Sequence, residues 1–282
     1  MWRLCITSAA DFSLCIARWF VIIRDGPGIA PGGQGEIASA SAGAGKAAEY
    51  SGRRESQIMT MDGIRVLVFD MGGVLIHYRW KEMLCDYGLP EEEALRVGRE
   101  MFDNPQNIWH EFDMATMTTQ EVIAAYYRAF PEDGEAIEWF IRHGEYMHVP
   151  RPKVWKLVHQ LKEAGWPIYL LSNYPEDLFR KHTEYADFMQ DLDGMVVSYT
   201  NHLSKPEPAI YNALLHRYHL TPSECLFFDD RKENVEGAVR CGMHGRQVLS
   251  QESLIEDLTH ILSGEPLEDR EETERTDRLP EE

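Results

Sequence analysis

The hydrophobic positions from residue 151 to residue 262 alternate between two periods. Short runs of β-branched and aromatic residues, such as PIYLLS at 167–172, predict buried strands, and so does VLVF at 66–69. Stretches with apolar residues three or four positions apart, such as 152–165, predict amphipathic helices. Strands that alternate with helices pair in parallel, so we expect an α/β fold, a doubly wound parallel sheet with helices on both faces. Further strands are predicted at 194–199, 224–229 and 246–249, and further helices from residues 175, 208, 234 and 252.

Residues 79–147 interrupt this alternation, because they contain no strong strand pattern. Thr118 or Thr119, ahead of Glu121, gives the sequence pattern of a helix N-cap. We therefore expect a helical cap at 79–147, inserted into a Rossmann-like core formed by residues 61–78 and 148–263. Three segments of the cap carry apolar residues at helical spacing, namely 91–102, 118–130 and 135–147.

Residues 1–60 differ in composition from the rest of the chain. The apolar stretch CIARWFVII is interrupted by Arg18 and is too short to span a bilayer. Residues 26–51 are rich in glycine, alanine and serine, which predicts a flexible linker. We interpret residues 1–60 either as a disordered or targeting extension, or as the result of a start assigned too early, with the functional chain beginning at Met59 or Met61.

The chain is acidic, with a formal net charge of −19, which argues against non-specific binding to nucleic acid or to anionic membranes. Residues 264–282 hold nine acidic and three basic residues, and we expect them to form a disordered acidic tail. The five cysteines show no CxxC motif and no paired spacing, which favours a reduced, cytoplasmic protein.

Side chains that can carry chemistry stand at the ends of three predicted strands. Asp70 follows the first strand, Ser172 and Asn173 end the second, and the pair Asp229–Asp230 ends a later one. Open α/β sheets bind ligands at the carboxyl ends of their strands. We therefore expect these side chains to lie close together at one edge of the sheet.

Two glycines and a lysine extend this pattern. Gly72 and Gly73 follow Asp70 almost at once and let the backbone turn sharply and approach a ligand. Lys205 lies between a loop and a predicted helix, and Asn234 lies one helical turn beyond the acidic pair. The order of carboxylate, hydroxyl, lysine and paired carboxylates is the most specific pattern in the chain.

The segments FDMGGVL, LLSN, SKPEPAIY and FFDDRKENVEGA resemble, in this order, the motifs of the haloacid dehalogenase-like (HAD) hydrolase superfamily. Each motif is weak by itself, but the four in order are specific, and the resemblance runs from Ile64 to Leu262. Within the superfamily the chain is similar to the subgroup with a small helical cap. It resembles the bacterial α-D-glucose-1-phosphatase-type sugar phosphatases, which also carry Asp-x-Gly in the first motif.

The resemblance implies that Asp70 is a nucleophile that accepts a phosphoryl group. It also implies a Mg²⁺ ion, since an all-oxygen site with one or two carboxylates suits this cation. The implied ligands are Asp70, Asp230 and the backbone carbonyl of Gly72. Asp229 and Asn234 are implied to support these ligands from behind.

Ser172, Asn173 and Lys205 are implied to bind the phosphoryl group. Ser172 offers its hydroxyl, Asn173 its backbone N–H and Lys205 its ammonium. Fixed donors of this kind lower the barrier when charge spreads over the phosphoryl oxygens in the transition state. Asp70, Ser172 and Lys205 are therefore the predicted catalytic residues.

Position 72 departs from the family pattern. Most phosphatases of the superfamily carry a second aspartate there, which protonates the leaving group and then activates water. With Gly72 in its place, three explanations are open. The substrate has a leaving group that needs little protonation, such as an anomeric sugar phosphate; another group, His77 or a cap residue, takes over; or the site is catalytically weak.

We therefore expect a Mg²⁺-dependent phosphatase that hydrolyses small-molecule phosphoesters, sugar phosphates in the first place, through an aspartyl-phosphate. One alternative is a 2-haloacid dehalogenase, which uses the same aspartate on carbon without a metal. The pair Asp229–Asp230 and the absence of an aromatic residue at position 72 argue against it. The other alternative is a non-catalytic binding module, for which Gly72 is the best support. We expect neither nucleic acid nor a membrane as a partner.

Overall fold

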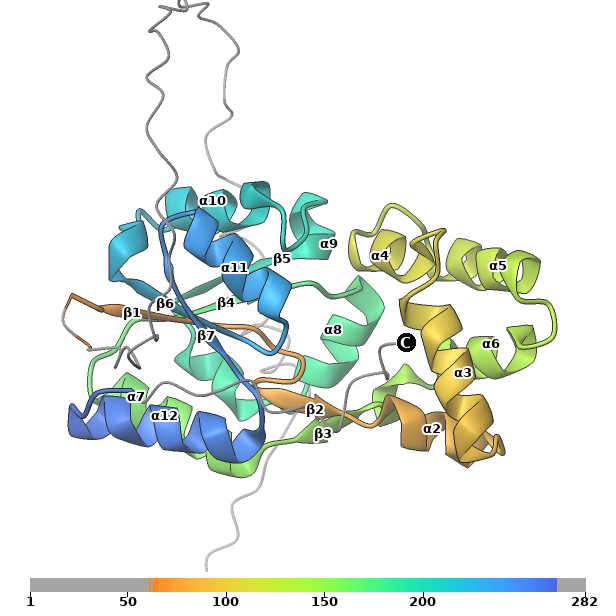
Figure 1. Ribbon diagram of the computed structural model, residues 1–282, viewed down its shortest axis with the longest axis horizontal. Helices are drawn as coiled ribbons and strands as arrows, with labels where there is room; N and C mark the ends of the chain where they lie inside the picture. Colours follow the sequence, from red (N-terminus) through yellow and green to blue (C-terminus); the bar gives the residue numbers. More distant parts are fainter. Residues whose placement is uncertain (1–60, 62, 268–282) are drawn as a thin grey trace, which may run out of the picture. The chain divides into compact units, whose positions relative to one another are not determined.

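A five-stranded parallel sheet lies at the centre of the computed structural model, which describes residue 61 and residues 63–267 (Figure 1). The strand order is β5-β4-β1-β6-β7, so the first strand is central and the chain crosses to both sides of it. Every neighbouring pair runs parallel. This topology confirms the predicted α/β fold class. The strands are β1 (Val66–Phe69), β4 (Ile168–Ser172), β5 (Gly194–Val197), β6 (Cys225–Asp229) and β7 (His244–Gln247).

The two faces of the sheet bury alternate side chains of each strand. On β1, Leu67 and Phe69 belong to the hydrophobic cluster that also contains residues of α7 (Pro152–Glu163) and α12 (Gln251–Ser263). Val66 and Val68 belong to a second cluster, which contains residues of α10 (Pro208–Arg217). Figure 1 shows α7 and α12 on one side of the sheet and α10 on the other. β1 is therefore apolar along its whole length because both of its faces are buried, as the sequence predicts.

Two core helices start near the carboxyl edge of the sheet. α8 (Glu176–Thr183) follows β4, and α11 (Lys232–Arg240) follows β6. Their first turns therefore lie near the expected site. The remaining short elements of the core are α9 (Ser198–Asn201), η2 (Asp187–Asp191) and η3 (Pro222–Glu224).

The chain between residues 80 and 146 forms five α-helices and one 3₁₀ turn, which we call the helical insert. Its second helix has the bounds that the hydrophobic pattern predicts. The insert occupies the right-hand part of Figure 1. Its elements are α2 (Trp80–Tyr87), α3 (Glu91–Phe102), α4 (Ile108–Asp113), α5 (Thr119–Ala129), α6 (Gly134–Arg142) and η1 (Gly144–Tyr146).

Local side-chain chemistry sets two boundaries in the insert. The Thr118 hydroxyl accepts a hydrogen bond from the Glu121 N–H (3.3 Å), and the Glu121 carboxylate accepts one from the Thr118 N–H (2.8 Å). This capping box starts α5, as the sequence predicts. The helix predicted at 135–147 instead ends at Arg142, and Gly144 begins a 3₁₀ turn that passes close under Leu178 of the core.

A short antiparallel ribbon connects the core to the insert, and the sequence did not predict it. β2 (Ile76–Tyr78) pairs with β3 (His148–Pro150), with Ile76 opposite Pro150 and Tyr78 opposite His148. Strands of three residues are too short for a periodic pattern to identify. Only the pairing of segments about seventy residues apart creates them.

The last strand is shifted relative to its prediction. β7 pairs with β6 from His244 to Gln247, two residues earlier than the apolar pattern at 246–249 indicates. Val248 is fully buried although it lies beyond the end of the strand. The apolar pattern therefore included a buried residue that does not belong to β7.

Of the segment expected to be an acidic tail, only residues 264–267 are described. Gly264 ends α12 with a φ of +74°, and Leu267 is buried against the core. The expectations for residues 1–60 and 268–282 lie outside the described residues. No helix in the described ranges is both long and apolar enough to cross a membrane.

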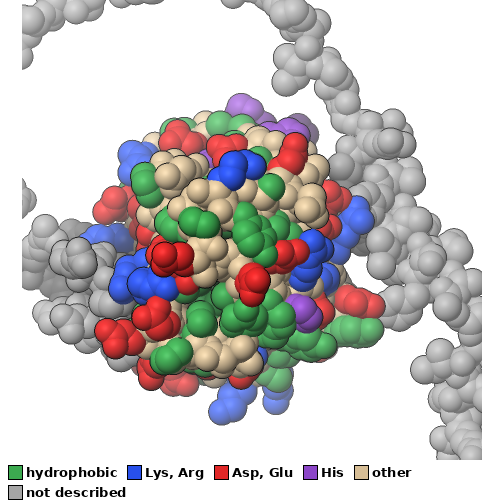
Figure 2. Space-filling view, turned by 90° about the vertical axis from the view of Figure 1, so that its right-hand side faces the viewer, with side chains coloured by type: hydrophobic (Ala, Val, Ile, Leu, Met, Phe, Trp, Pro, Cys, Tyr) green, Lys and Arg blue, Asp and Glu red, His purple; other side chains and the backbone are tan. Residues whose placement is uncertain are grey.

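The exposed side of the insert carries charges of both signs. Figure 2 shows this end of the molecule, where acidic and basic side chains are interspersed with hydrophobic ones. Arg96, for example, forms an ion pair with Asp133 (2.8 Å), and Arg142 forms one with Glu138 (2.7 Å).

Candidate active site

The carboxyl edge of the sheet brings together the ends of the three central strands. Asp70 lies directly after β1, Ser172 is the last residue of β4, and Asp229 is the last residue of β6. The Asp70 N–H donates a hydrogen bond to the Phe228 carbonyl (2.8 Å), which continues the β1–β6 ladder and fixes the backbone of Asp70. β1 lies between the other two strands, so Asp70 stands at the middle of the edge.

Lys205 is buried between two carboxylates. Its Nζ lies 2.8 Å from Asp70 Oδ1 and 2.6 Å from Asp229 Oδ2. The Nζ donates a hydrogen bond to Asp229. Asp70 Oδ1 is in ion-pair contact, but it accepts no hydrogen bond of good geometry from any described residue. The lysine thus joins residues 70 and 229 at the end of the sheet, far apart in the sequence.

The side chain of Asn173 holds the backbone of Lys205 from both sides. Its Oδ1 accepts a hydrogen bond from the Lys205 N–H (2.8 Å), and its Nδ2 donates one to the Lys205 carbonyl (3.0 Å). The sequence assigned only the backbone N–H of Asn173 a role. The amide clamp was missed, because nothing in a sequence indicates a partner thirty-two positions away.

Asp229 uses both of its oxygens in hydrogen bonds. Oδ1 accepts from the Arg231 N–H (2.8 Å) and from Asn234 Nδ2 (3.0 Å). Oδ2 accepts from Lys205 Nζ (2.6 Å) and again from Asn234 Nδ2 (3.1 Å). Asn234 thus holds both carboxylate oxygens of Asp229 in place.

The site has an excess of negative charge. The carboxylate oxygens of Asp70, Asp229 and Asp230 lie within 4.8 Å of one another, and one ammonium, that of Lys205, faces two of them. Burial raises the pKa of Asp70 to about 7; Lys205 opposes this shift, and Asp229 and Asp230 add to it. Burial acts to lower the pKa of Lys205, but the charges of Asp229 and Asp70 outweigh it and raise that pKa.

These donors fit a hard divalent cation. Each of the three carboxylates offers an oxygen within 4.8 Å of the others, and carboxylate oxygens are the ligands that Mg²⁺ prefers. Asp229 accepts hydrogen bonds on both of its oxygens, so it is less suited to contact an ion directly than Asp70, whose Oδ1 accepts none from the described residues.

The loop after Asp70 is held over the edge of the sheet. Arg151 donates hydrogen bonds to the carbonyls of Gly73 (2.7 Å) and Val74 (3.0 Å). Gly73 has a φ of +69°, and a Cβ atom there would lie 2.6 Å from the carboxyl carbon of Asp230. A glycine at position 73 is therefore required both by its backbone conformation and by the neighbouring carboxylate.

Ser172 contributes a buried hydroxyl to this edge. The residue is 1% exposed, and its Oγ has no hydrogen-bond partner among the described residues. Burying a hydroxyl without a partner costs free energy. Such a group indicates a ligand that completes its hydrogen bonding.

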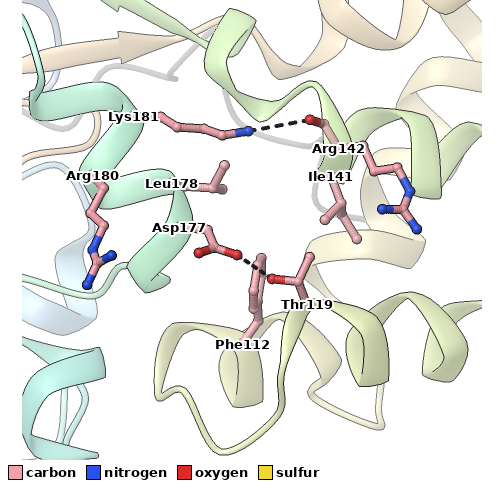
Figure 3. Close-up of a pocket in the computed structure, with 8 residues that line it drawn as sticks. All are labelled: Phe112, Thr119, Ile141, Arg142, Asp177, Leu178, Arg180 and Lys181. Carbon is pink, nitrogen blue, oxygen red and sulfur yellow. Dashed lines mark hydrogen bonds between the residues drawn. The ribbon is translucent and has the colours of Figure 1, made fainter.

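A pocket lies between α8 and the helical insert (Figure 3). Thr119 Oγ1 donates a hydrogen bond to Asp177 (2.5 Å), and Lys181 Nζ donates one to the Arg142 carbonyl (3.4 Å). Leu178 points into the space between them in Figure 3. None of the predicted site residues lines this pocket.

The fold and the site define an α/β protein in which three carboxylates and a buried lysine lie together at the carboxyl end of a parallel sheet. The model of the haloacid dehalogenase-like hydrolase family matches residues 64–242. The chain belongs to this family, which confirms the resemblance to the superfamily seen in its motifs.

Named relatives are similar over most of their length. A sesquiterpene phosphatase of Aspergillus oryzae is 23% identical over 64% of this chain and 88% of its own. A validoxylamine A 7'-phosphate phosphatase of Streptomyces hygroscopicus is 23% identical over 70% of this chain and 95% of its own.

Solved structures share the fold. A HAD family enzyme of Bacteroides thetaiotaomicron, in complex with magnesium and inorganic phosphate, matches with a TM-score of 0.53 and 22% identity. The match covers 65% of this chain and 93% of the other. A dehalogenase matches with a TM-score of 0.53 and 21% identity, over 66% and 85% of the two chains. At these identities the likeness establishes the fold and does not separate a phosphatase from a dehalogenase.

Proposed function

We propose that this hydrolase is a Mg²⁺-dependent phosphatase of small phosphorylated metabolites, with sugar phosphates the class expected from its motifs. The observation that carries the proposal is the cluster of Asp70, Asp229 and Asp230 around Lys205, at the edge of the sheet that also holds the unpartnered Ser172 hydroxyl. Relatives named as a sesquiterpene phosphatase, a validoxylamine A 7'-phosphate phosphatase and a flavin mononucleotide hydrolase support the reaction class.

Asp70 is the proposed nucleophile. Its oxygen bonds to phosphorus, the ester oxygen leaves, and an aspartyl-phosphate forms that water then hydrolyses. Lys205 holds the carboxylate from behind, because its Nζ contacts Asp70 Oδ1 at 2.8 Å. Asp229 keeps that ammonium in place through its 2.6 Å contact.

Asp70, Asp230 and the Gly72 carbonyl would hold the Mg²⁺ ion, with Asp229 and Asn234 behind them. The ion would reduce the repulsion between an anionic nucleophile and an anionic ester. The solved neighbour that contains magnesium and phosphate is consistent with this cofactor.

The Ser172 hydroxyl, the Asn173 backbone N–H and the Lys205 ammonium would bind the phosphoryl oxygens. A phosphoryl oxygen would satisfy the Ser172 Oγ, which has no partner among the described residues. The Asn173 amide clamp supports this role indirectly, because it fixes the backbone from which Lys205 extends.

The test is phosphate release from a panel of phosphoesters, with Mg²⁺ and with EDTA, by wild type and Asp70→Asn. The panel contains anomeric sugar phosphates, sugar 6-phosphates, flavin mononucleotide and an activated aryl phosphate. We expect Mg²⁺-dependent release that Asp70→Asn abolishes, because an amide is a poor nucleophile. Turnover by Asp70→Asn at the wild-type rate would refute the mechanism.

Failure on the whole panel would favour one of the alternatives. Halide release from 2-haloacids without Mg²⁺ would identify a dehalogenase, the function named for some solved neighbours. Absence of both activities would favour a non-catalytic binding module.

A further inference from the structure

An alkyl phosphate needs a proton donor for its leaving oxygen, because an alkoxide is a poor leaving group. Gly72 offers no side chain, and the adjoining space is filled: a Cβ atom at position 72 would lie 2.3 Å from Tyr78 Cε2 and 2.6 Å from the Tyr78 hydroxyl. Burial raises the pKa of Tyr78 well above its usual range, so this hydroxyl is a weak acid. His77 directly precedes Tyr78 on β2, so its side chain lies on the opposite face of the ribbon from Tyr78.

The end of α4 in the helical insert is attached to the core near the site. The Asp113 carbonyl accepts a hydrogen bond from Ser198 Oγ (2.5 Å), and that Oγ accepts one from the Tyr174 N–H (2.8 Å). The carbonyl of Met114 contacts His202 Nδ1 (2.7 Å). Figure 1 accordingly shows α4 beside α9. These contacts link Asp113 to the segment that directly follows β4 and its terminal serine.

The Asp113 carboxyl group is available for chemistry. It is half-buried, and within the described part of the chain it takes part in no hydrogen bond and no ion pair. Asp113 is the last residue of α4, and its carbonyl is joined through Ser198 to Tyr174, two residues beyond the end of β4, so the residue lies at the carboxyl edge of the sheet that also holds the proposed nucleophile. Burial raises the pKa of Asp113 to about 8, with Arg231 opposing the shift and Asp70 adding to it, so the carboxyl holds a proton in neutral solution.

We propose that Asp113 is the catalytic acid and base that serves Asp70 in place of a side chain at position 72. This inference rests on the proposed phosphatase function. As Asp70 bonds to phosphorus, the ester P–O bond breaks and the Asp113 proton passes to the leaving oxygen, which releases a neutral alcohol.

The second step restores both groups. The Asp113 carboxylate takes a proton from water while the water oxygen bonds to phosphorus. The P–O bond to Asp70 breaks, inorganic phosphate leaves, and the Asp70 carboxylate and the Asp113 acid are regenerated. The insert would therefore contribute to the chemistry itself, and the alcohol part of the substrate would lie under the end of α4.

The test compares Asp113→Asn with the matched control Asp103→Asn on two esters, a sugar 6-phosphate and p-nitrophenyl phosphate. Asp103 also lies on the insert and interacts with Arg231, but Asp70 is not among its electrostatic neighbours. Rapid mixing measures the first turnover, and steady-state assays measure the rest. Asp113→Ser, whose side chain is smaller than aspartate, serves as a second variant if the amide disturbs folding.

We expect Asp113→Asn to lose activity on the sugar phosphate by about 100-fold or more, the usual range for a catalytic acid. On p-nitrophenyl phosphate, whose leaving group needs no proton, it should release one nitrophenolate per enzyme at close to the wild-type rate and then turn over slowly. Asp103→Asn should behave as wild type on both esters.

Two results would overturn the inference. Full turnover of both esters by Asp113→Asn would show that another group transfers the protons. An equal loss of the first turnover on both esters would show that Asp113 only positions the site. The activity of the wild type separates a failure of the inference from a failure of the proposed function. If wild type hydrolyses neither ester, the proposed function itself is wrong; if wild type is active, the behaviour of Asp113→Asn tests the inference alone.

Discussion

The ring of Tyr78 lies against Gly72, in the space that any side chain at position 72 would have to fill. Tyr78 lies on strand β2 of the ribbon, and Gly72 lies in the loop that follows β1 and Asp70. The ribbon therefore packs against this loop through the contact between the two residues. A glycine at this position is therefore a steric requirement of this chain. An aspartate introduced there would have to displace the tyrosine before it could reach a substrate.

Gly72→Ala should lower the stability of the protein, because its Cβ atom would meet Tyr78 Cε2 at 2.3 Å. Overpacking of this kind costs about 1–3 kcal/mol. The free energies of unfolding of Gly72→Ala, Tyr78→Ala and the double variant form a cycle. We expect a coupling energy of about 0.5–3 kcal/mol, with the double variant more stable than the sum of the single effects predicts. Additive effects would contradict the steric account.

Lys205→Met should inactivate the enzyme and destabilise it. The substitution leaves the carboxylates of Asp70 and Asp229 buried without their cation, and breaking a buried pair costs about 3–5 kcal/mol. Lys162→Met is the matched control, since its 2.6 Å pair with Asp193 lies at the surface. That variant should lose less than about 1 kcal/mol. Urea denaturation of both variants measures the difference; equal losses would refute the prediction.

Asn173→Ala should impair phosphate binding without unfolding the protein. The variant removes both hydrogen bonds that hold the backbone of Lys205. We expect kcat/KM to fall about 10-fold and inorganic phosphate to inhibit more weakly, since each bond contributes about 1 kcal/mol. Asn201→Ala, which removes a surface amide bonded to Arg217, is the control. Unchanged phosphate inhibition in Asn173→Ala would show that the clamp has no role in the site.

His182 should make stability depend on pH. Its Nε2 contacts the Gly144 carbonyl (2.7 Å) and its Nδ1 the Tyr174 hydroxyl (2.5 Å), which joins α8 to the insert. Burial lowers the pKa of His182 from 6.5 to about 4. Below pH 6.5 the unfolded chain gains a proton that the folded chain excludes. Stability therefore falls from pH 6.5 down to about 4, by on the order of 3 kcal/mol in total.

The measurement is the free energy of unfolding of wild type and His182→Gln between pH 4 and 7.5. The difference between them should shrink as the pH falls, because the variant has no proton to exclude. His216→Gln, which replaces an exposed histidine, is the control for the substitution itself. A difference for His182→Gln that does not vary with pH would disprove the assignment.

Features that depend on residues close together in the sequence were predicted correctly, whereas features that depend on contacts between distant segments were not. β1 was predictable because a strand buried on both faces must be apolar along its whole length, and α5 because Thr118 and Glu121 cap it locally. The β2–β3 ribbon was not, since its three-residue strands exist only through pairing with each other. β7 was misplaced by two residues because Val248 is buried outside the strand.

The sequence by itself determined the class of protein and the chemical groups of its site. Parallel topology sends the carboxyl end of each strand to one edge, so the strand-end positions of Asp70, Ser172 and Asp229 implied their meeting, while the family resemblance implied that Lys205 joins them. Only the tertiary structure decided what surrounds them: the Asn173 clamp on Lys205, the Tyr78 ring beside Gly72 and the hydrogen bond that joins Asp113 of the insert to Ser198 of the core. These contacts join segments that lie far apart in the chain, and their geometry depends on packing, which no local pattern encodes.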